Sequence, residues 1–275
     1  MKKIGITTEL AADIKEDLIK KYNIGVVAFH TDIKENIFKK MRETGECIKT
    51  SQPSMAVYLE MFKKKLEEFE KIIHITTSSR VSGAFNSANQ AKKFLGENAE
   101  RVLILDSEKS SAAQGLLVLK TQEDVDLGLS LKEILNNFKE RVKNTFVFFM
   151  YDEPKWLKAG GRFPKIAQIG LQKIKDFNVS LVLREKGGVI RPVAFKKNAT
   201  NLVDPLFDEF KKFTKGVEKR INVVITHGDD MIQANKLRKK LETLKNVKVL
   251  YIKLLDIVLG AHIGPNALVI NFEYD

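Results

Sequence analysis

The chain has 275 residues, of which 44% are hydrophobic and 8% aromatic, and a formal net charge of +12. This length suits one large domain or two ordinary ones, and the apolar content supports a soluble core without disulfide or metal staples. The single cysteine, Cys47, excludes an intrachain disulfide and favours a reducing compartment. The first residues enter a strand pattern without a signal-type apolar region, and no uncharged apolar run reaches the roughly 18 residues of a membrane span. We therefore expect a cytoplasmic protein that is not integral to a membrane.

The positive charge comes mostly from lysines, which are spread in pairs along helical segments that also carry glutamates. Examples are Lys92-Lys93, Lys211-Lys212 and Lys239-Lys240. Proteins that recognise bases in duplex DNA favour arginine, and proteins that bind single strands stack aromatic side chains on the bases. A lysine-rich pattern therefore argues against a nucleic-acid partner. We expect a solvated lysine-rich surface, whose sign suits transient contact with a membrane surface or an acidic partner.

Strand and helix patterns alternate through the first half of the chain. The expected strands are residues 4–8, 25–29, 72–77 and 102–105, and the expected helices are 11–21, 53–69, 82–95 and 112–121. This alternation predicts a parallel sheet with helices on both faces, in which ligands bind beyond the carboxyl ends of the strands. Residues 1–150 are expected to form this Rossmann-like domain and to carry the ligand-binding turns.

A different pattern begins after a charged helix at 131–143 and an apolar strand at 145–150. Asp152-Glu153-Pro154 is typical of a helix start, and we place the domain boundary there. Strands at 179–184 and 189–195 flank Glu185-Lys186-Gly187-Gly188 and predict an antiparallel hairpin. Helices at 202–213 and 231–244 and strands at 221–226, 247–254 and 268–273 complete an expected mixed α/β domain at 151–275. The predicted fold class is therefore α/β with two domains.

The strand at 72–77 runs into a hydroxyl-rich turn, Ser78-Ser79-Arg80-Val81-Ser82-Gly83, and then into a helix. The first turn of a helix has free backbone N–H groups and the positive end of the peptide dipole, so hydroxyls there indicate a receptor for an anionic head group. This chemistry alone leaves open whether the anion is a phosphate or a carboxylate. It also leaves open that Ser82 is simply the helix N-cap, and that Ser51 caps the helix that follows Pro53.

Four fragments recur in an order and spacing that resembles the DegV family of fatty-acid-binding proteins, and the resemblance covers nearly the whole chain. They are Thr50-Ser51-Gln52-Pro53-Ser54, the Ser78 to Gly83 turn, Gly160-Gly161-Arg162, and Gly260-Ala261-His262-Ile263-Gly264-Pro265. The chain departs from the family pattern at Thr8-Glu9-Leu10, in place of threonine-aspartate-serine, and at Ala84, Ser180 and Lys196 or Lys197. A lysine does not reproduce a bidentate arginine contact.

The resemblance implies that the chain encloses one long-chain fatty acid, with the carboxylate in an interdomain cleft and the tail in the apolar interior of one domain. It further implies that the chain is not an enzyme, has no cofactor, and presents the acid to a separate fatty acid kinase that forms the acyl phosphate. The head-group residues that it indicates are Thr50, Ser78, Ser79, Ser82, Arg162 and His262. We expect Gly160 or Gly161 to cap a short helix, the second glycine to approach another surface, and His262 to lie in a glycine-proline loop.

Two other classes of function remain as alternatives. A serine hydrolase would use Ser79, His262 and an acid such as Asp106, but the chain has no Gly-x-Ser-x-Gly elbow. A phosphate- or nucleotide-binding protein would use the same turn, but the chain has neither a Walker lysine loop nor a Gly-x-Gly-x-x-Gly motif. Of the other histidines, His74 is expected in the core and His227 in a helix-capping turn, without a metal.

Overall fold

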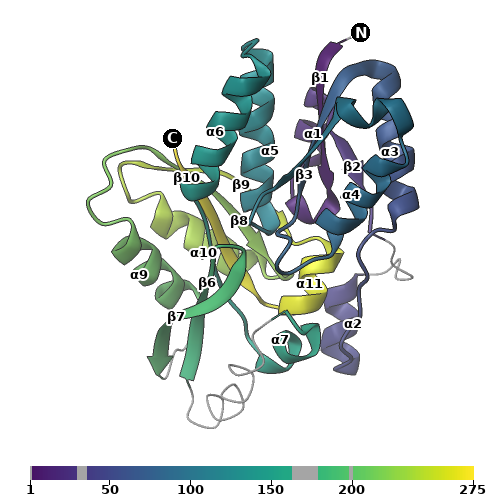
Figure 1. The fold of residues 1–275 in the computed structure, drawn as a ribbon. Coiled ribbons are helices and arrows are strands. Elements are labelled where there is room, and N and C mark those ends of the chain that lie inside the picture. Colours follow the sequence, from purple (N-terminus) through teal and green to yellow (C-terminus); the bar gives the residue numbers. More distant parts are fainter. Residues whose placement is uncertain (1, 30–35, 163–178, 198–200) are drawn as a thin grey trace. The chain divides into compact units, whose positions relative to one another are not determined.

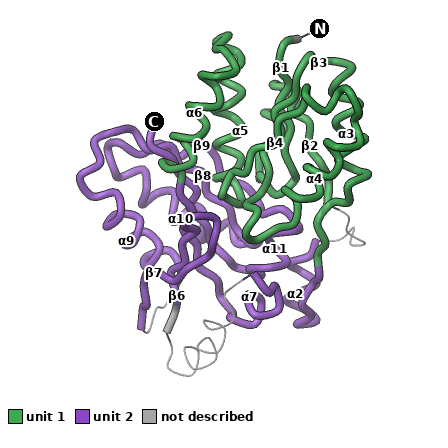
Figure 2. The backbone as a smooth tube through the Cα atoms, in the orientation of Figure 1, with its two compact units in different colours: residues 1–32, 50–145 green, residues 33–49, 146–275 purple. Residues whose placement is uncertain are grey.

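A computed structural model describes residues 2–29, 36–162, 179–197 and 201–275. The chain forms two compact units, shown in different colours in Figure 2: residues 1–32 and 50–145 make up unit 1, and residues 33–49 and 146–275 make up unit 2. Each unit contains its own sheet, and the two sheets confirm the predicted α/β fold class with two domains. None of the helices in the described residues is both long enough and apolar enough to cross a membrane.

Unit 1 contains a four-stranded sheet in the order β2-β1-β3-β4, and neighbouring strands pair in parallel. The strands are β1 (Lys2–Glu9), β2 (Gly25–Val27), β3 (Phe69–Thr76) and β4 (Val102–Asp106). Because the strands are parallel, Glu9, Thr76 and Asp106 end at the same edge of the sheet. This is the edge at which ligands bind in sheets of this kind.

Helices cover both faces of this sheet, as the alternating pattern predicted. Unit 1 contains η1 (Leu10–Ala12), α1 (Glu16–Tyr22), α3 (Met55–Glu68), α4 (Ala84–Lys93), η2 (Gly96–Arg101), α5 (Ser111–Asp126) and α6 (Leu131–Lys143). Ile72 packs in a core cluster with α3 and α4, whereas its neighbours Ile73 and Ile75 pack in another with α5 and α6. Adjacent side chains of a strand point to opposite faces, so β3 contributes to both layers.

The helix expected at residues 11–21 is wrong in its first part. A short 3-10 turn, η1, ends at Asp13, which takes the left-handed conformation with φ 49°, and α1 begins only at Glu16. The buried Asp13 carboxylate accepts a hydrogen bond from Ser111 Oγ at 2.8 Å. Ser111 lies 98 residues from Asp13 in the sequence. The local apolar spacing therefore did not reveal that the helix is interrupted at Asp13.

Unit 2 contains a six-stranded sheet in the order β7-β6-β5-β10-β8-β9. The strands are β5 (Thr145–Met150), β6 (Val179–Lys186), β7 (Val189–Lys197), β8 (Ile221–His227), β9 (Val247–Leu254) and β10 (Leu268–Tyr274). The β6–β7 hairpin is confirmed, and it turns at Gly187 and Gly188 with φ of 57° and 74°. These angles explain the two glycines, because a two-residue hairpin turn with positive φ at both positions disfavours other residues.

The helices α9 (Val203–Phe213) and α10 (Met231–Leu241) pack against one face of this sheet in an aromatic-rich core around Phe148, Phe210 and Phe272. The described part of unit 2 also contains three shorter helices, α2 (Ile37–Thr44), α7 (Pro154–Gly160) and α11 (Ile257–Ile263), all labelled in Figure 1. The α2 and α11 helices were not expected from the sequence. They pack closely, since a Cβ on Gly260 would lie 2.4 Å from the Phe38 ring.

Candidate functional site

The Ser78 turn is held firmly at the carboxyl edge of the unit 1 sheet. The Ser78 N–H donates to the carbonyl oxygen of Lys109 at 2.9 Å, and the Ser79 N–H donates to the Asp106 carboxylate at 3.2 and 3.3 Å. The Ser78 carbonyl in turn accepts from the N–H groups of Val81 and Ser82. The turn is therefore tied to the end of β4 and to the loop that follows it.

The three serines of this turn differ in exposure and in the bonds they make. Ser78 is fully buried, and its Oγ accepts from the Arg80 N–H at 3.3 Å, so it shapes the turn. The side chain of Ser79 is exposed. Ser82 Oγ accepts from the Ala84 N–H at 3.2 Å, but the N-cap of α4 is Gly83, so the N-cap alternative for Ser82 is wrong. Of the three hydroxyls, that of Ser79 is the most accessible to a ligand.

The Thr50 fragment is joined to this turn by a residue that sequence reasoning missed, Gln52. Its side chain lies directly over Gly83, where a Cβ would come within 1.8 Å of Gln52 Oε1, and its Nε2 donates to Ser87 Oγ at 3.1 Å. Within unit 1 the structure thus brings together two fragments that are separate in the sequence. The N-cap of α3 is Ser54, without a side-chain cap bond, so the capping alternative for Ser51 is wrong.

In unit 2 the structure brings together Gly160, Arg162 and His262. Arg162 Nη1 donates to the Gly160 carbonyl at 2.8 Å, and a Cβ on Gly160 would lie 2.8 Å from His262 Nδ1. Gly161 is the left-handed C-cap of α7 with φ 68°, and a Cβ there would meet nothing within 4 Å. The capping role is confirmed, but the close approach is made by the first glycine and not, as expected, by the second.

His262 lies in the last turn of α11 and not in a loop, which corrects the expectation from its glycine- and proline-rich surroundings. The helix ends at Gly264, where a Cβ would lie 2.1 Å from the Trp156 ring. Burial, together with the positive charge of Arg162, lowers the pKa of His262 to about 4. His262 is therefore a neutral imidazole at physiological pH, beside a permanently charged guanidinium.

The other two described histidines have structural roles. His74 is fully buried and packs edge-on against Tyr58 and Phe62, which confirms its expected place in the core. His227 Nδ1 accepts from the Asp230 N–H at 3.1 Å in the turn before α10, as expected for a helix-capping turn. Within the part of the chain that the structure describes, no three His, Cys, Asp or Glu side chains are grouped to hold a metal ion.

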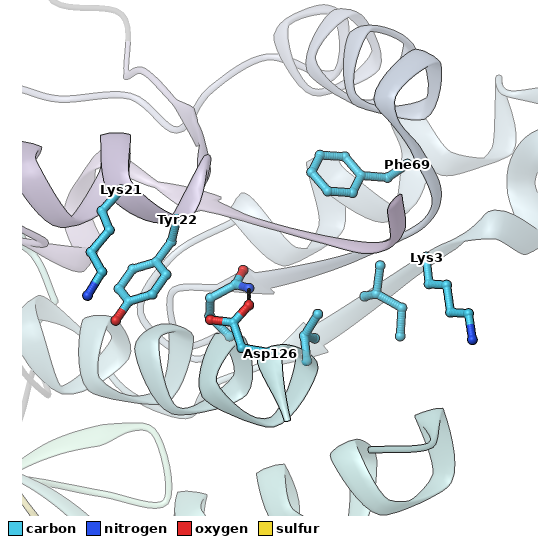
Figure 3. Close-up of a pocket in the computed structure, with 8 residues that line it drawn as sticks. Lys3, Lys21, Tyr22, Phe69 and Asp126 are labelled. Atoms are coloured by element: carbon cyan, nitrogen blue, oxygen red, sulfur yellow. Dashed lines mark hydrogen bonds between the residues drawn. The ribbon is translucent and has the colours of Figure 1, made fainter. Parts of the chain in front are cut away.

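Figure 3 shows a hollow of about 550 Å³ in unit 1. It is lined by Lys3, Ile4, Lys21, Tyr22, Phe69, Gln122, Val125 and Asp126. Lys3 and Phe69 belong to the amino ends of β1 and β3, so this hollow is at the edge opposite to that expected for the ligand. Its charged groups are of both signs, and we do not assign it to the candidate site.

The geometry around Asp106 does not resemble that of a catalytic triad. The acid of a triad accepts a hydrogen bond from a histidine and so fixes its tautomer. Among the described residues, the carboxylate of Asp106 instead accepts from the backbone N–H groups of Ser79 and Glu108. The bond that Ser79 makes to Asp106 comes from its backbone and does not activate its hydroxyl.

The chain belongs to the DegV family, because residues 3–275 match the sequence model of that family. The model bears the description "Uncharacterised protein, DegV family". It is 25% identical over 292 residues to a fatty acid-binding protein of Thermotoga maritima, and the match covers 98% of each chain. A fatty-acid-binding DegV family protein of Thermus thermophilus has the same fold, with a TM-score of 0.89, 24% identity and coverage of 99% and 100%. A stearic acid-binding protein of Eubacterium ventriosum also has a TM-score of 0.89, with 22% identity over 98% of each chain.

Proposed function

We propose that this chain is a non-catalytic, cytoplasmic carrier that binds one long-chain fatty acid. The observation that carries this proposal is the link from Gln52 to Gly83 and Ser87, because it assembles the two hydroxyl-bearing fragments of unit 1 at the ligand-binding edge of a parallel sheet. Relatives described as fatty acid-binding proteins support the choice of a carboxylate over a phosphate.

The proposed head-group site in unit 1 comprises the Thr50 loop and the turn with Ser78, Ser79 and Ser82. A carboxylate that leaves water needs several hydrogen-bond donors, and hydroxyl groups beside the start of a helix supply them. The exposed Ser79 hydroxyl is the proposed direct donor, together with Thr50. The buried Ser78 and the half-buried Ser82 hold the shape of the turn through their bonds to Arg80 and Ala84.

The tail supplies most of the proposed binding free energy. Each buried methylene contributes ~0.8 kcal/mol, so about fourteen of them contribute on the order of 11 kcal/mol before the costs of ordering. The bonds to the carboxylate add specificity for an acid over an alcohol or ester of the same length. No cofactor is needed for this function.

We assign Arg162 and His262 of unit 2 a different role, in presenting the acid to a partner kinase. A phosphate that forms on the carboxylate gains negative charge, so a cation and a hydrogen-bonding imidazole stabilise that step more than the bound acid itself. The contact of Arg162 with Gly160, and of Gly160 with His262, holds the guanidinium and the imidazole in one place. This chain would then be the subunit that holds the substrate, and the kinase would be the catalyst.

Lipid extraction of the purified protein tests the carrier function. We expect denaturing mass spectrometry of the extract to find a long-chain fatty acid at close to one molecule per chain. An extract without fatty acid, together with failure of an added fluorescent fatty acid to bind, would make a phosphate ligand the better assignment. Rapid stoichiometric labelling of Ser79 by a fluorophosphonate would instead favour the hydrolase alternative.

A further inference from the structure

A buried carboxylate with five donors lies directly beneath the candidate site in unit 1. Glu9, the last residue of β1, is 1% exposed. Its Oε1 accepts from the Tyr58 hydroxyl at 3.0 Å and from His74 Nε2 at 3.3 Å. Its Oε2 accepts from the Thr77 N–H at 2.7 Å, the Thr77 hydroxyl at 2.9 Å and Gln114 Nε2 at 3.1 Å. Buried carboxylates are rare unless their oxygens are satisfied in this way.

The surroundings of Glu9 keep it ionised. Burial by itself would raise the pKa of Glu9, but the hydrogen bond and charge of His74 and the two bonds from Thr77 outweigh it and hold the pKa below its ordinary value. Burial, with the Glu9 charge, raises the pKa of Tyr58, so the Tyr58 hydroxyl stays protonated and donates. Because an ionised carboxylate only accepts, His74 Nε2 carries its proton and donates as well.

The bonds of Glu9 reach the residue before the Ser78 turn and two helices of unit 1, α3 and α5. The shortest one, to the Thr77 N–H, holds the residue that immediately precedes Ser78. Tyr58 lies on α3, which follows the Thr50 loop, and Gln114 lies on α5. A hydrogen bond to an ionised acceptor is roughly twice as strong as one between neutral groups, so the charge of Glu9 matters for the stiffness of the turn.

We propose that Glu9 is a positioning residue, whose charged Oε2 fixes the backbone of Thr77 and thereby the place of Ser78 and Ser79 under the head group. The expected effect of Glu9 on fatty acid affinity rests on the proposed function. The expected effect of Glu9 on the backbone of the turn does not. The position is also one where the chain departs from the family pattern, with glutamate in place of aspartate. The longer side chain of Glu9 reaches Thr77 and Tyr58 at the same time.

The variant Glu9→Gln tests the charge while it preserves the shape of the network. With the amide nitrogen on the side of Oε1, the Tyr58 hydroxyl can rotate to accept, and His74 can leave Nε2 free to accept while a proton on Nδ1 donates to Thr7 Oγ1, 2.9 Å away. The amide oxygen then still faces Thr77 and Gln114, but without a charge. The fold is thus retained, and only the charge assistance to the turn is lost.

The matched control is Asp124→Asn, which makes the same chemical change at another buried carboxylate of unit 1. Asp124 is 2% exposed and accepts from Arg141 and Asn137, on α6, away from the turn. Both variants should lower the melting temperature. Only Glu9→Gln should speed amide hydrogen exchange over residues 77–82, by roughly tenfold, and weaken the binding of a long-chain fatty acid by roughly fivefold to tenfold.

The two readouts separate this inference from the proposed function. If the wild-type protein binds fatty acid and Glu9→Gln changes neither exchange in the turn nor affinity, Glu9 is only structural and the inference is overturned, while the carrier function stands. If the wild-type protein binds no fatty acid, the carrier function fails, and exchange over residues 77–82 alone decides the role of Glu9. Should Glu9→Gln not fold, Glu9→Asp replaces it, because a carboxylate withdrawn by about 1.5 Å loses the Thr77 N–H and should speed exchange equally.

Discussion

Gln52 and Gly83 are in such close contact that Gly83 has no room for a side chain: a Cβ there would come within 1.8 Å of Gln52 Oε1. Gly83 has φ −80°, an ordinary value for any residue, so the glycine is needed for the approach of Gln52 and not for a special backbone conformation. The same side chain donates to Ser87 on α4. One glutamine thus determines how the Thr50 loop lies against the Ser78 turn in unit 1.

The variant Gly83→Ala should therefore displace Gln52 at little cost in stability. The obstructing atoms are the end of a flexible side chain, so we expect the free energy of unfolding to fall by less than about 1.5 kcal/mol, the value of one hydrogen bond. Fatty acid affinity should fall severalfold, because the Thr50 loop loses its anchor. Ser87→Ala removes the partner of Gln52 without a steric change and should shift affinity in the same direction. Unchanged affinity in both variants, measured by fluorescent fatty acid displacement, would exclude a role for this contact.

Ser79→Ala should weaken acid binding by about tenfold or more. It removes a donor to a charged group, a loss of ~1.5–3 kcal/mol, while the exposed position of Ser79 predicts little change in stability. Ser130→Ala serves as the control, because Ser130 forms the capping box of α6 with Glu133. That variant should lose about 1 kcal/mol of stability and retain its affinity. Equal affinities for Ser79→Ala and the wild type would remove Ser79 from the head-group site.

Gly160→Ala should impair presentation of the acid more than its binding. The added Cβ would lie 2.8 Å from His262 Nδ1 and 3.3 Å from His262 Cα, so the imidazole must move. We expect this variant, His262→Ala and Arg162→Ala to retain most fatty acid affinity and to lose acyl phosphate formation with a cognate kinase. Parallel losses of binding and transfer in all three would contradict the separate roles proposed for unit 1 and unit 2 residues.

The low pKa of His262 predicts a specific loss of stability in mild acid. In the unfolded chain His262 takes up a proton as the pH falls below 6.5, but in the folded protein only near pH 4. Between these values the unfolded state binds more protons, so stability decreases as the pH falls from 6.5 to about 4. The contribution is at most about 3 kcal/mol, and His262→Gln should lack it. Chemical denaturation of both proteins at pH 7 and pH 5 measures it, and identical pH dependence would show that His262 titrates normally.

The sequence predicted those parts of the fold that depend on local periodicity. The helix at 131–143 and the strand Val247–Leu254 agree with the structure to the residue, because an apolar face and a strong cap are visible in the local pattern. The α11 helix was missed because Gly260, Gly264 and Pro265 are typical of loops. Its conformation depends on packing against Phe38, from a distant part of the chain.

The candidate site was predictable where the chemistry lies in one segment, and not where it depends on contacts. The Ser78 turn and the left-handed Gly161 follow from residue types alone. The roles of Gln52 and Glu9 did not follow from residue type, because a single glutamine or glutamate forms no recognisable motif. Gln52 matters because the fold places it against Gly83, and Glu9 matters because the fold places it beside Thr77. A glycine at the start of a helix and a charged residue at the end of a buried strand are the signals that could have identified them.

Titration calorimetry of the delipidated protein tests the carrier function most directly. We expect a long-chain fatty acid to bind with one site per chain. We expect the alcohol of the same length to bind at least tenfold more weakly, because it lacks the negative charge to which the Ser79 turn donates hydrogen bonds. Ser79→Ala should reduce this difference between acid and alcohol. Binding of neither compound would contradict the carrier function, and equal binding of both in the wild type and in Ser79→Ala would contradict recognition of the carboxylate by this turn.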